Sequence, residues 1–125
     1  MSIFKNTKEI GQFGEDAAAK VLKKKGYKVT ARNYSCQFGE IDIIACQGDT
    51  LIFVEVKTRR SALYGTPAEA VTYNKRQHIV NTAKYYLMQT EYDGNFRFDV
   101  VEIYLSAAGK AENIVHIENA ITNIS

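Results

Sequence analysis

Apolar residues recur along residues 8–25 at the spacing of one helical face. They are Ile10, Phe13, Ala17 and Val21, with Ala18 and Leu22 beside them. A period near 3.6 residues is typical of an amphipathic helix that packs on a core. Gly26 follows three lysines, which favours a helix end because glycine adopts the left-handed backbone and cations offset the helix dipole. The pattern therefore predicts a helix over residues 8–25.

Two β-branched runs stand on either side of a short Gly-Asp turn. They are residues 40–46 (EIDIIAC) and residues 51–58 (LIFVEVKT), with Gly48 and Asp49 between them. This arrangement is typical of a β-hairpin. If Gly48 and Asp49 form the loop, the numbers of paired residues sum to 97, as 48 and 49 do. This register predicts that Asp42 faces Glu55 and that Glu40 faces Lys57.

Other segments complete the predicted fold. Residues 27–32, 95–105 and 113–118 have the pattern of strands, and residues 33–39 that of a polar loop. Thr66, Pro67 and Glu69 are placed as an N-cap, a first-turn proline and a capping-box acid, so a helix should begin there. Either it continues unbroken to Met88, or a first helix ends and a second begins at Tyr73 and Asn74. The order predicts an α/β fold with a central mixed sheet of about five strands flanked by helices.

Composition narrows the class of protein. A chain of 125 residues with 46% hydrophobic content and one proline is expected to form a single domain over residues 1–125. It contains no run of about 18 apolar residues and no secretory signal, so we expect a cytoplasmic protein without membrane contact. Cys36 and Cys46 lack metal-site or disulfide spacing. A net charge of +2 is too small to identify a nucleic-acid-binding protein by itself.

The central hairpin carries charges where a core strand would carry apolar residues. Alternation predicts one wholly apolar face, formed by Ile41, Ile43, Ala45, Ile52, Val54 and Val56. The open end of the other face carries Glu40, Asp42, Glu55 and Lys57. A charge buried alone costs on the order of several kcal/mol, so these groups must be paired, metal-bound or at the mouth of a cleft.

The predicted register suggests a specific chemistry for these charges. Asp42 and Glu55 would lie about 4.5 Å apart at their Cα atoms and repel each other. A divalent cation, Mg²⁺ or Mn²⁺, bound by Asp42 and Glu55 removes that repulsion. Lys57 can then hold or deprotonate a water, or stabilise charge on a phosphate. The structural alternative is a cross-strand ion pair between Glu40 and Lys57, with Asp42 as a surface charge.

An acid on one strand followed by Glu-x-Lys at the end of the next resembles the PD-(D/E)xK nuclease motif. The wider pattern is similar to that of the YraN-like family, which is related to archaeal Holliday junction resolvases. The matching residues are Gly14, Glu15, Ala18, Gly26, Tyr27, Arg32, Asn33, residues 39–42, residues 53–57, Arg59, Pro67, Lys75 and residues 97–101. The resemblance implies a restriction-endonuclease-like core with Asp42, Glu55 and Lys57 as the catalytic set. Ile41 replaces the motif's proline, which only shapes the strand.

The resemblance also implies that Glu15 is a catalytic acid contributed by the first helix. Its position alone leaves two orientations open, into the cleft or along the surface, because it borders the apolar stripe. Arg59, Arg32, Lys75 and Arg76 are candidates for phosphate contacts, and Arg59 is favoured because it continues the face of Glu55 and Lys57. His78, His116 and Asp99 are expected to be structural.

These observations predict a Mg²⁺- or Mn²⁺-dependent endonuclease that acts on DNA. A branched substrate and a symmetric homodimer are implied by the resemblance. One alternative is a non-catalytic nucleic-acid-binding module of the same fold, and another is an interaction protein with a structural metal ion. The intact set of Asp42, Glu55 and Lys57 favours the enzyme.

Overall fold

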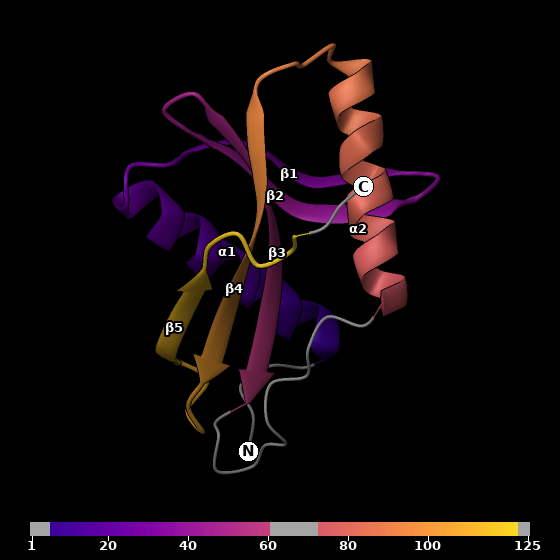
Figure 1. Cartoon of the computed structure of the whole chain (residues 1–125). Coiled ribbons are helices and arrows are strands. Elements are labelled where there is room, and N and C mark those ends of the chain that lie inside the picture. The colour runs from indigo at the N-terminus through magenta and orange to yellow at the C-terminus, as the bar shows by residue number, and fades with distance from the viewer. Residues whose placement is uncertain (1–5, 61–72, 123–125) are drawn as a thin grey trace.

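The computed structural model describes residues 6–60 and 73–122. The elements are α1 (Thr7–Lys24), β1 (Lys28–Cys36), β2 (Gly39–Gln47), β3 (Thr50–Arg60), α2 (Tyr73–Gln89), β4 (Asn95–Leu105) and β5 (Ala111–Ile117) (Figure 1). This order confirms the predicted α/β fold. The helix start predicted at Thr66 and Pro67 lies outside the described residues, whereas Tyr73 and Asn74 lie within α2.

The strands form one mixed sheet in the order β1-β2-β3-β4-β5. The β3 and β4 strands are parallel, and the other neighbours are antiparallel. The predicted hairpin register is confirmed from Gln47–Thr50 through to Ile43–Val54. Gly48 has a φ of 59°, a left-handed conformation that suits glycine in a tight hairpin turn.

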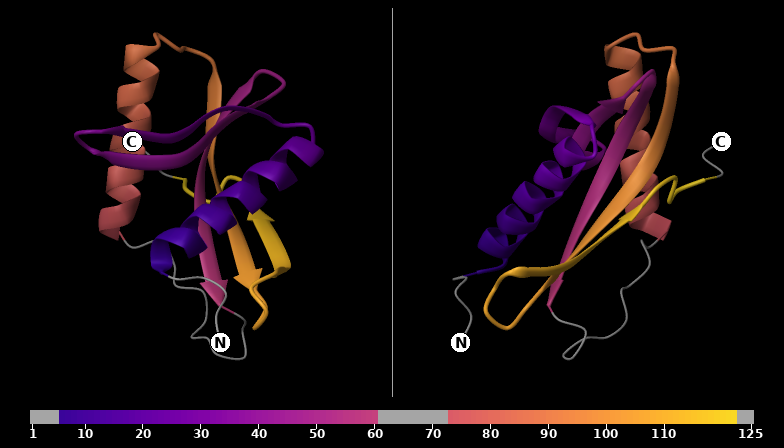
Figure 2. Two further views of the ribbon diagram at one scale, coloured as in Figure 1. Left: turned by 180° about the vertical axis from the view of Figure 1, so that it is seen from behind. Right: turned by 90° about the vertical axis from the view of Figure 1, so that its left-hand side faces the viewer.

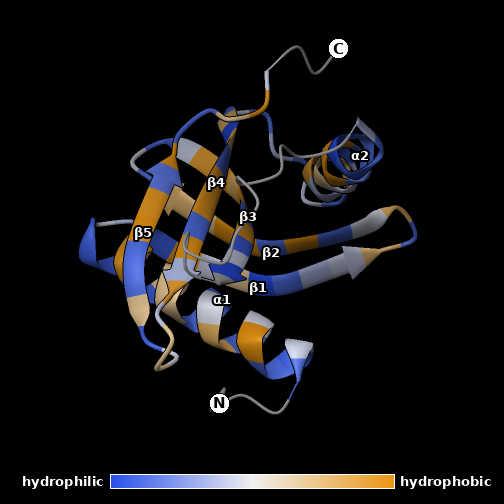
Figure 3. Cartoon of the chain, turned by 90° about the horizontal axis from the view of Figure 1, so that it is seen from below, coloured by the Kyte–Doolittle hydropathy of each residue, from blue (hydrophilic) through white to orange (hydrophobic). Residues whose placement is uncertain are grey.

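The two helices cover opposite faces of the sheet, as the edge-on view in Figure 2 shows. On one face Ala18, Ala19 and Leu22 of α1 pack on Ile43, Ala45, Ile52, Val54, Val101 and Ile103. On the other face Ile79, Val80 and Ala83 of α2 pack on Ile41, Ile44, Leu51, Phe53 and Phe98. Figure 3 shows α1 lying along one side of the sheet, with apolar and polar residues alternating along its ribbon. Each fully buried large apolar side chain contributes about 1.5–3 kcal/mol, so these two layers hold the helices in place.

Helix α1 comes very close to β3 at Gly14. A Cβ atom at this position would lie 1.7 Å from Thr58 Oγ1 and 2.8 Å from Thr58 Cβ on β3. Only glycine allows this approach, and the next residue, Glu15, is thereby held against the sheet. The close contact explains how a residue of α1 joins a site built mainly on β2 and β3.

One segment differs from the prediction. Residues 33–39, expected as a polar loop, continue β1 to Cys36, and Cys36 pairs with Gly39. Their polarity suits an edge strand, because Asn33 and Ser35 are exposed whereas Tyr34 packs on the α2-side core. Neither helix in the described residues is long and apolar enough to cross a membrane.

Candidate active site

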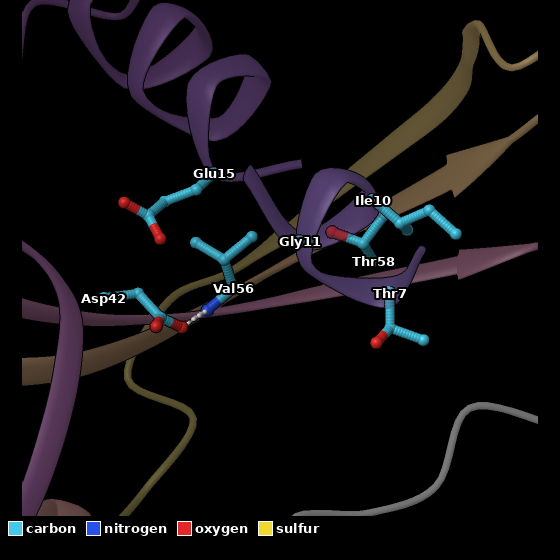
Figure 4. A pocket seen from close by; sticks show the side chains of 7 residues that line it. All are labelled: Thr7, Ile10, Gly11, Glu15, Asp42, Val56 and Thr58. Atoms are coloured by element: carbon cyan, nitrogen blue, oxygen red, sulfur yellow. Dashed lines mark hydrogen bonds between the residues drawn. The ribbon is translucent and has the colours of Figure 1, made fainter. Parts of the chain in front are cut away.

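The candidate site lies where β2 and β3 part. Their regular pairing ends at Ile43 and Val54, one step short of the pair predicted between Asp42 and Glu55. The Asp42 side chain fills the fork: its Oδ2 accepts a hydrogen bond from the Val56 N–H at 2.8 Å, shown dashed in Figure 4. The fork therefore fixes the Asp42 carboxylate beside Val56, within β3.

The regular alternation of side chains between the two faces of the sheet breaks in β2 at Asp42. Ile41 packs with Ile44 on the α2 side, whereas Ile43 packs on the α1 side. The prediction that Ile41 and Ile43 share one apolar face is therefore wrong. The β1 register places Asn33 opposite Asp42, and Asn33 has a φ of 54°. A left-handed residue interrupts the two-residue alternation of the strand pair, so side chains beyond it face the opposite way.

Glu55 lies beside Asp42 and is half-buried. Burial, followed by the charge of Asp42 and a hydrogen bond with it, raises the pKa of Glu55 to about 8. The positive charges of Lys57 and Lys75 offset only part of this effect. Two carboxylates in such contact repel each other when both are ionised, so without a cation the Glu55 carboxyl retains a proton at neutral pH.

Glu15 points toward the site rather than along the surface. It is 8% exposed, and its Oε1 accepts a hydrogen bond from Arg32 Nε at 3.2 Å. Burial raises the pKa of Glu15, the Arg32 hydrogen bond opposes this, and the nearby Asp42 charge raises it further. Asn33 also donates a hydrogen bond to Glu15, a contact that the spacing of residues alone does not reveal.

A pocket of about 390 Å³ opens on the α1 side of the fork. Its lining residues are Thr7, Ile10, Gly11, Glu15, Asp42, Val56 and Thr58. In Figure 4 the carboxylates of Glu15 and Asp42 lie at one end of this pocket, and the hydroxyls of Thr7 and Thr58 lie at the other. This pocket therefore brings the acid of α1 next to the acid of β2.

A second pocket, of about 220 Å³, opens on the α2 side. Its lining residues are Gly39, Glu40, Glu55, Lys57, Lys75, His78 and Ile79. Glu40 and Lys57, the residues of the alternative ion pair, both border this space. Glu55 and Lys57 thus face one pocket, Asp42 and Glu15 face the other, and the two acids of the hairpin meet between them.

The basic residues predicted to contact phosphate are divided between the site and its surroundings. Lys75 lies in the α2-side pocket. Arg59 pairs with Glu102 at 3.6 Å and lies two residues beyond Lys57 on β3. Arg32 pairs with Glu15 at 3.1 Å and with Asp16 at 2.6 Å. Arg76 donates to the carbonyl of Thr122, which ties α2 to the segment after β5.

Asp42 and Glu55 have the donor chemistry that a hard divalent cation requires. Mg²⁺ and Mn²⁺ prefer carboxylate oxygens and commonly retain several water ligands. In residues 6–60 and 73–122, no three Asp, Glu, His or Cys side chains form a metal-ligand group by themselves. The two carboxylates can therefore supply part of a coordination shell, with water in the remaining positions.

The sequence matches the profile of the uncharacterised protein family UPF0102 over residues 14–103, a stretch that contains Glu15, Asp42, Glu55 and Lys57. The chain belongs to the UPF0102 family. It is 45% identical over 116 residues to a UPF0102 protein of Caldicellulosiruptor saccharolyticus, covering 92% of this chain and 98% of the relative. A UPF0102 protein of Clostridium acetobutylicum is 47% identical over 114 residues, covering 90% and 93%.

Another buried acid of the UPF0102 chain is Asp99, which lies on β4 beside Val54, the last residue of β3 that pairs regularly with β2. Asp99 accepts hydrogen bonds from Arg97 at 2.9 Å, from His116 at 2.7 Å and from the Asn119 N–H at 3.0 Å. Lys25 Nζ lies 2.7 Å from His116 Nδ1, and since an ammonium only donates, Nδ1 accepts and Nε2–H donates to Asp99. Asp99 is thus the hydrogen-bonded acid that was predicted, and His116 is one of its donors.

Proposed function

We propose that this UPF0102 protein is a Mg²⁺- or Mn²⁺-dependent endonuclease that hydrolyses phosphodiester bonds in DNA. The proposal depends on one observation above all: two mutually repelling carboxylates, Asp42 and Glu55, meet at the fork, and Lys57 follows on the same face as Glu55. An acid pair with an adjacent ammonium is the set of groups that metal-assisted phosphodiester hydrolysis requires.

Asp42 and Glu55 would hold the cation. When bound, such a cation supplies an activated water and stabilises negative charge on the phosphate. Lys57 orients the attacking water or stabilises the charge that develops on the phosphate oxygens. Glu15 would contribute a further catalytic acid from the α1 side, where its carboxylate accepts a hydrogen bond from Arg32. The Val56 N–H holds Asp42 in the orientation that faces Glu55.

The nature of the substrate follows from resemblance and from charge. The acid and Glu-x-Lys pattern resembles that of PD-(D/E)xK nucleases, and the wider pattern is similar to that of a family related to Holliday junction resolvases. This supports DNA, in a branched or otherwise structured form, and a homodimer that cuts two strands. Lys75 in the α2-side pocket and Arg59 farther along β3 are the proposed phosphate contacts.

The decisive experiment compares cleavage of single-stranded, nicked, flapped and four-way DNA in Mg²⁺ and in Mn²⁺. Lys57→Ala should reduce single-turnover cleavage by about a hundredfold or more, the scale of a lost general base or charge stabiliser. Binding of the same DNA in Ca²⁺ should remain nearly unchanged. Lys84→Ala, which changes an exposed lysine of α2, is the matched control and should cleave like the parent.

Equal cleavage by the parent and Lys57→Ala would contradict the proposal, because the activity would then come from another site or a contaminant. Tight binding of junctions without cleavage in either metal would instead favour the non-catalytic nucleic-acid-binding module.

A further inference from the structure

The turn between β1 and β2 presents an exposed aromatic ring. Cys36 pairs with Gly39, so Gln37 and Phe38 are the two turn residues. Hairpin turns favour Gly, Asn, Asp, Ser and Pro, which meet the backbone demands of the turn. Phe38 is 43% exposed, in a chain whose other described phenylalanines are at least partly buried. Neither turn geometry nor core packing accounts for a phenylalanine here.

The turn is held firmly against α2. Gly39 has a φ of +149°, and a Cβ there would lie 3.1 Å from Thr82 Oγ1 and 3.3 Å from His78 Cβ. The ring of Phe38 meets the ring of Tyr85 edge to face, with centroids 5.9 Å apart and planes at 60°. Figure 1 shows the hairpin passing alongside α2. Phe38 is therefore fixed on one side by Tyr85 while much of its surface remains open to solvent.

This ring stands next to the α2-side pocket. Gly39, the neighbour of Phe38, lines that pocket together with Glu55 and Lys57. His78 lines it from α2, and Tyr85 follows seven residues later on the same helix. At 1.5 Å per residue this separation is about 10 Å along the helix axis, which corresponds to about three stacked nucleotides of one DNA strand.

We infer that Phe38 stacks on an unpaired nucleobase of a DNA strand whose phosphate lies beside Lys57 and Lys75. This inference rests on the proposed nuclease function and specifies its substrate: DNA whose duplex is interrupted within about three nucleotides of the cut. Aromatic side chains bind bases of any sequence by stacking, so the contact selects structure and not sequence. A fully paired base already has stacking neighbours, and exposing its face costs free energy that an unpaired base does not lose.

Fluorescence of 2-aminopurine tests the contact without requiring cleavage. The base is placed as a single unpaired nucleotide at each of the first three positions from a nick, and in a fully paired duplex of otherwise equal sequence. Binding is measured in Ca²⁺. We expect the parent to alter the fluorescence of the unpaired base, and Phe38→Ala to lose this signal and about tenfold in affinity for the interrupted duplex. Phe38→Tyr should retain both. Affinity for the paired duplex should be equal in all variants.

Ile117→Ala is the matched control, since Ile117 is also an exposed apolar residue, 41% exposed, and lies on β5, at the opposite edge of the sheet from β1. It should behave like the parent. Equal binding and equal fluorescence in the parent and Phe38→Ala would overturn the inference. So would a Phe38→Ala variant that changes only the sedimentation of the protein, because Phe38 would then be a protein contact.

A Phe38-dependent fluorescence signal without cleavage in Mg²⁺ or Mn²⁺ would support the stacking site and contradict the nuclease. Cleavage that depends on Lys57, with no effect of Phe38→Ala on substrate preference or fluorescence, would support the nuclease and overturn the stacking site.

Discussion

Replacing Glu55 with Gln should change how the stability of the protein depends on pH. Burial and the charge of Asp42 raise the pKa of Glu55 from 4.5 to about 8, so the folded protein holds a proton that the unfolded chain releases. Between these two pH values unfolding releases a proton, and the free energy of unfolding therefore falls as pH rises. Since each pKa unit corresponds to about 1.4 kcal/mol, the upper limit of the loss is roughly 5 kcal/mol.

The two carboxylates titrate together, so we expect a measured loss of about 2 kcal/mol or more in the parent between pH 5 and pH 9. Glu55→Gln removes the ionisable group and keeps its shape. The variant should thus gain stability over the parent as pH rises. Urea unfolding followed by circular dichroism in EDTA measures this at each pH. Glu112→Gln, which changes an exposed glutamate of β5, is the control and should follow the parent.

Parallel stability curves for the parent and Glu55→Gln across this range would refute the reasoning, because no proton would then be linked to folding at Glu55. A second set of unfolding measurements adds Mg²⁺ at pH 8.5. At ten times its dissociation constant it should stabilise the parent by about 1.4 kcal/mol. In Glu55→Gln it should have little effect if Glu55 is a ligand.

Two further substitutions test contacts that stabilise the folded protein. Gly14→Ala forces a Cβ into Thr58 and should cost about 1–3 kcal/mol in urea unfolding, with a smaller loss in a Thr58→Ala background, where the 1.7 Å contact is gone. Asp99→Asn should cost on the order of 3 kcal/mol at pH 7, because Arg97 and His116 would lose their buried anion and Arg97 would keep only the exposed Glu118. Hydrogen bonds to Asp99 outweigh its burial and lower its pKa below 3.8, so the stability that Asp99 contributes is present above that pH. The difference between parent and variant should therefore shrink as pH falls through the folded-state pKa, and equal stability of the two proteins at pH 7 would refute this account.

The fold could be predicted because its main signals are local. The Gly48–Asp49 turn sets the register of the central hairpin, and helical periodicity locates α1 to within one residue at each end. That register predicted a pair between Asp42 and Glu55, whereas the ladder ends at Ile43 and Val54 and the two acids meet at the fork. The fork could not be predicted, because the prediction assumed that side chains alternate strictly between the two faces of the sheet. The left-handed backbone of Asn33, opposite Asp42, interrupts that alternation. Asparagine tolerates that backbone better than most residues, which is the only local signal for it.

The remaining features of the site depend on tertiary contacts that the sequence pattern does not reveal. The periodicity of α1 leaves Glu15 at the border of its apolar stripe, and the contact between Gly14 and Thr58 decides which way it points. His116 finds its partner Lys25 at a sequence separation of 91 residues, which no spacing rule relates. The position of Phe38 beside the pocket likewise depends on how the β1–β2 turn docks on α2.

Asp99 and Glu55 are stabilised in opposite ways, and the contrast bears on function. Asp99 is surrounded by donors: Arg97, His116 and a backbone N–H hold its pKa down even though burial opposes ionisation. The fold can therefore stabilise a buried carboxylate where one serves structure. Glu55 instead lies against another acid, and its pKa rises to about 8. A chain selected for stability alone would gain from Gln at this position, and charges that destabilise the folded state are characteristic of functional sites. A divalent cation between Asp42 and Glu55 would turn their repulsion into attraction, which is why the fork, and not the better-bonded Asp99 network, is the place to look for metal-dependent chemistry.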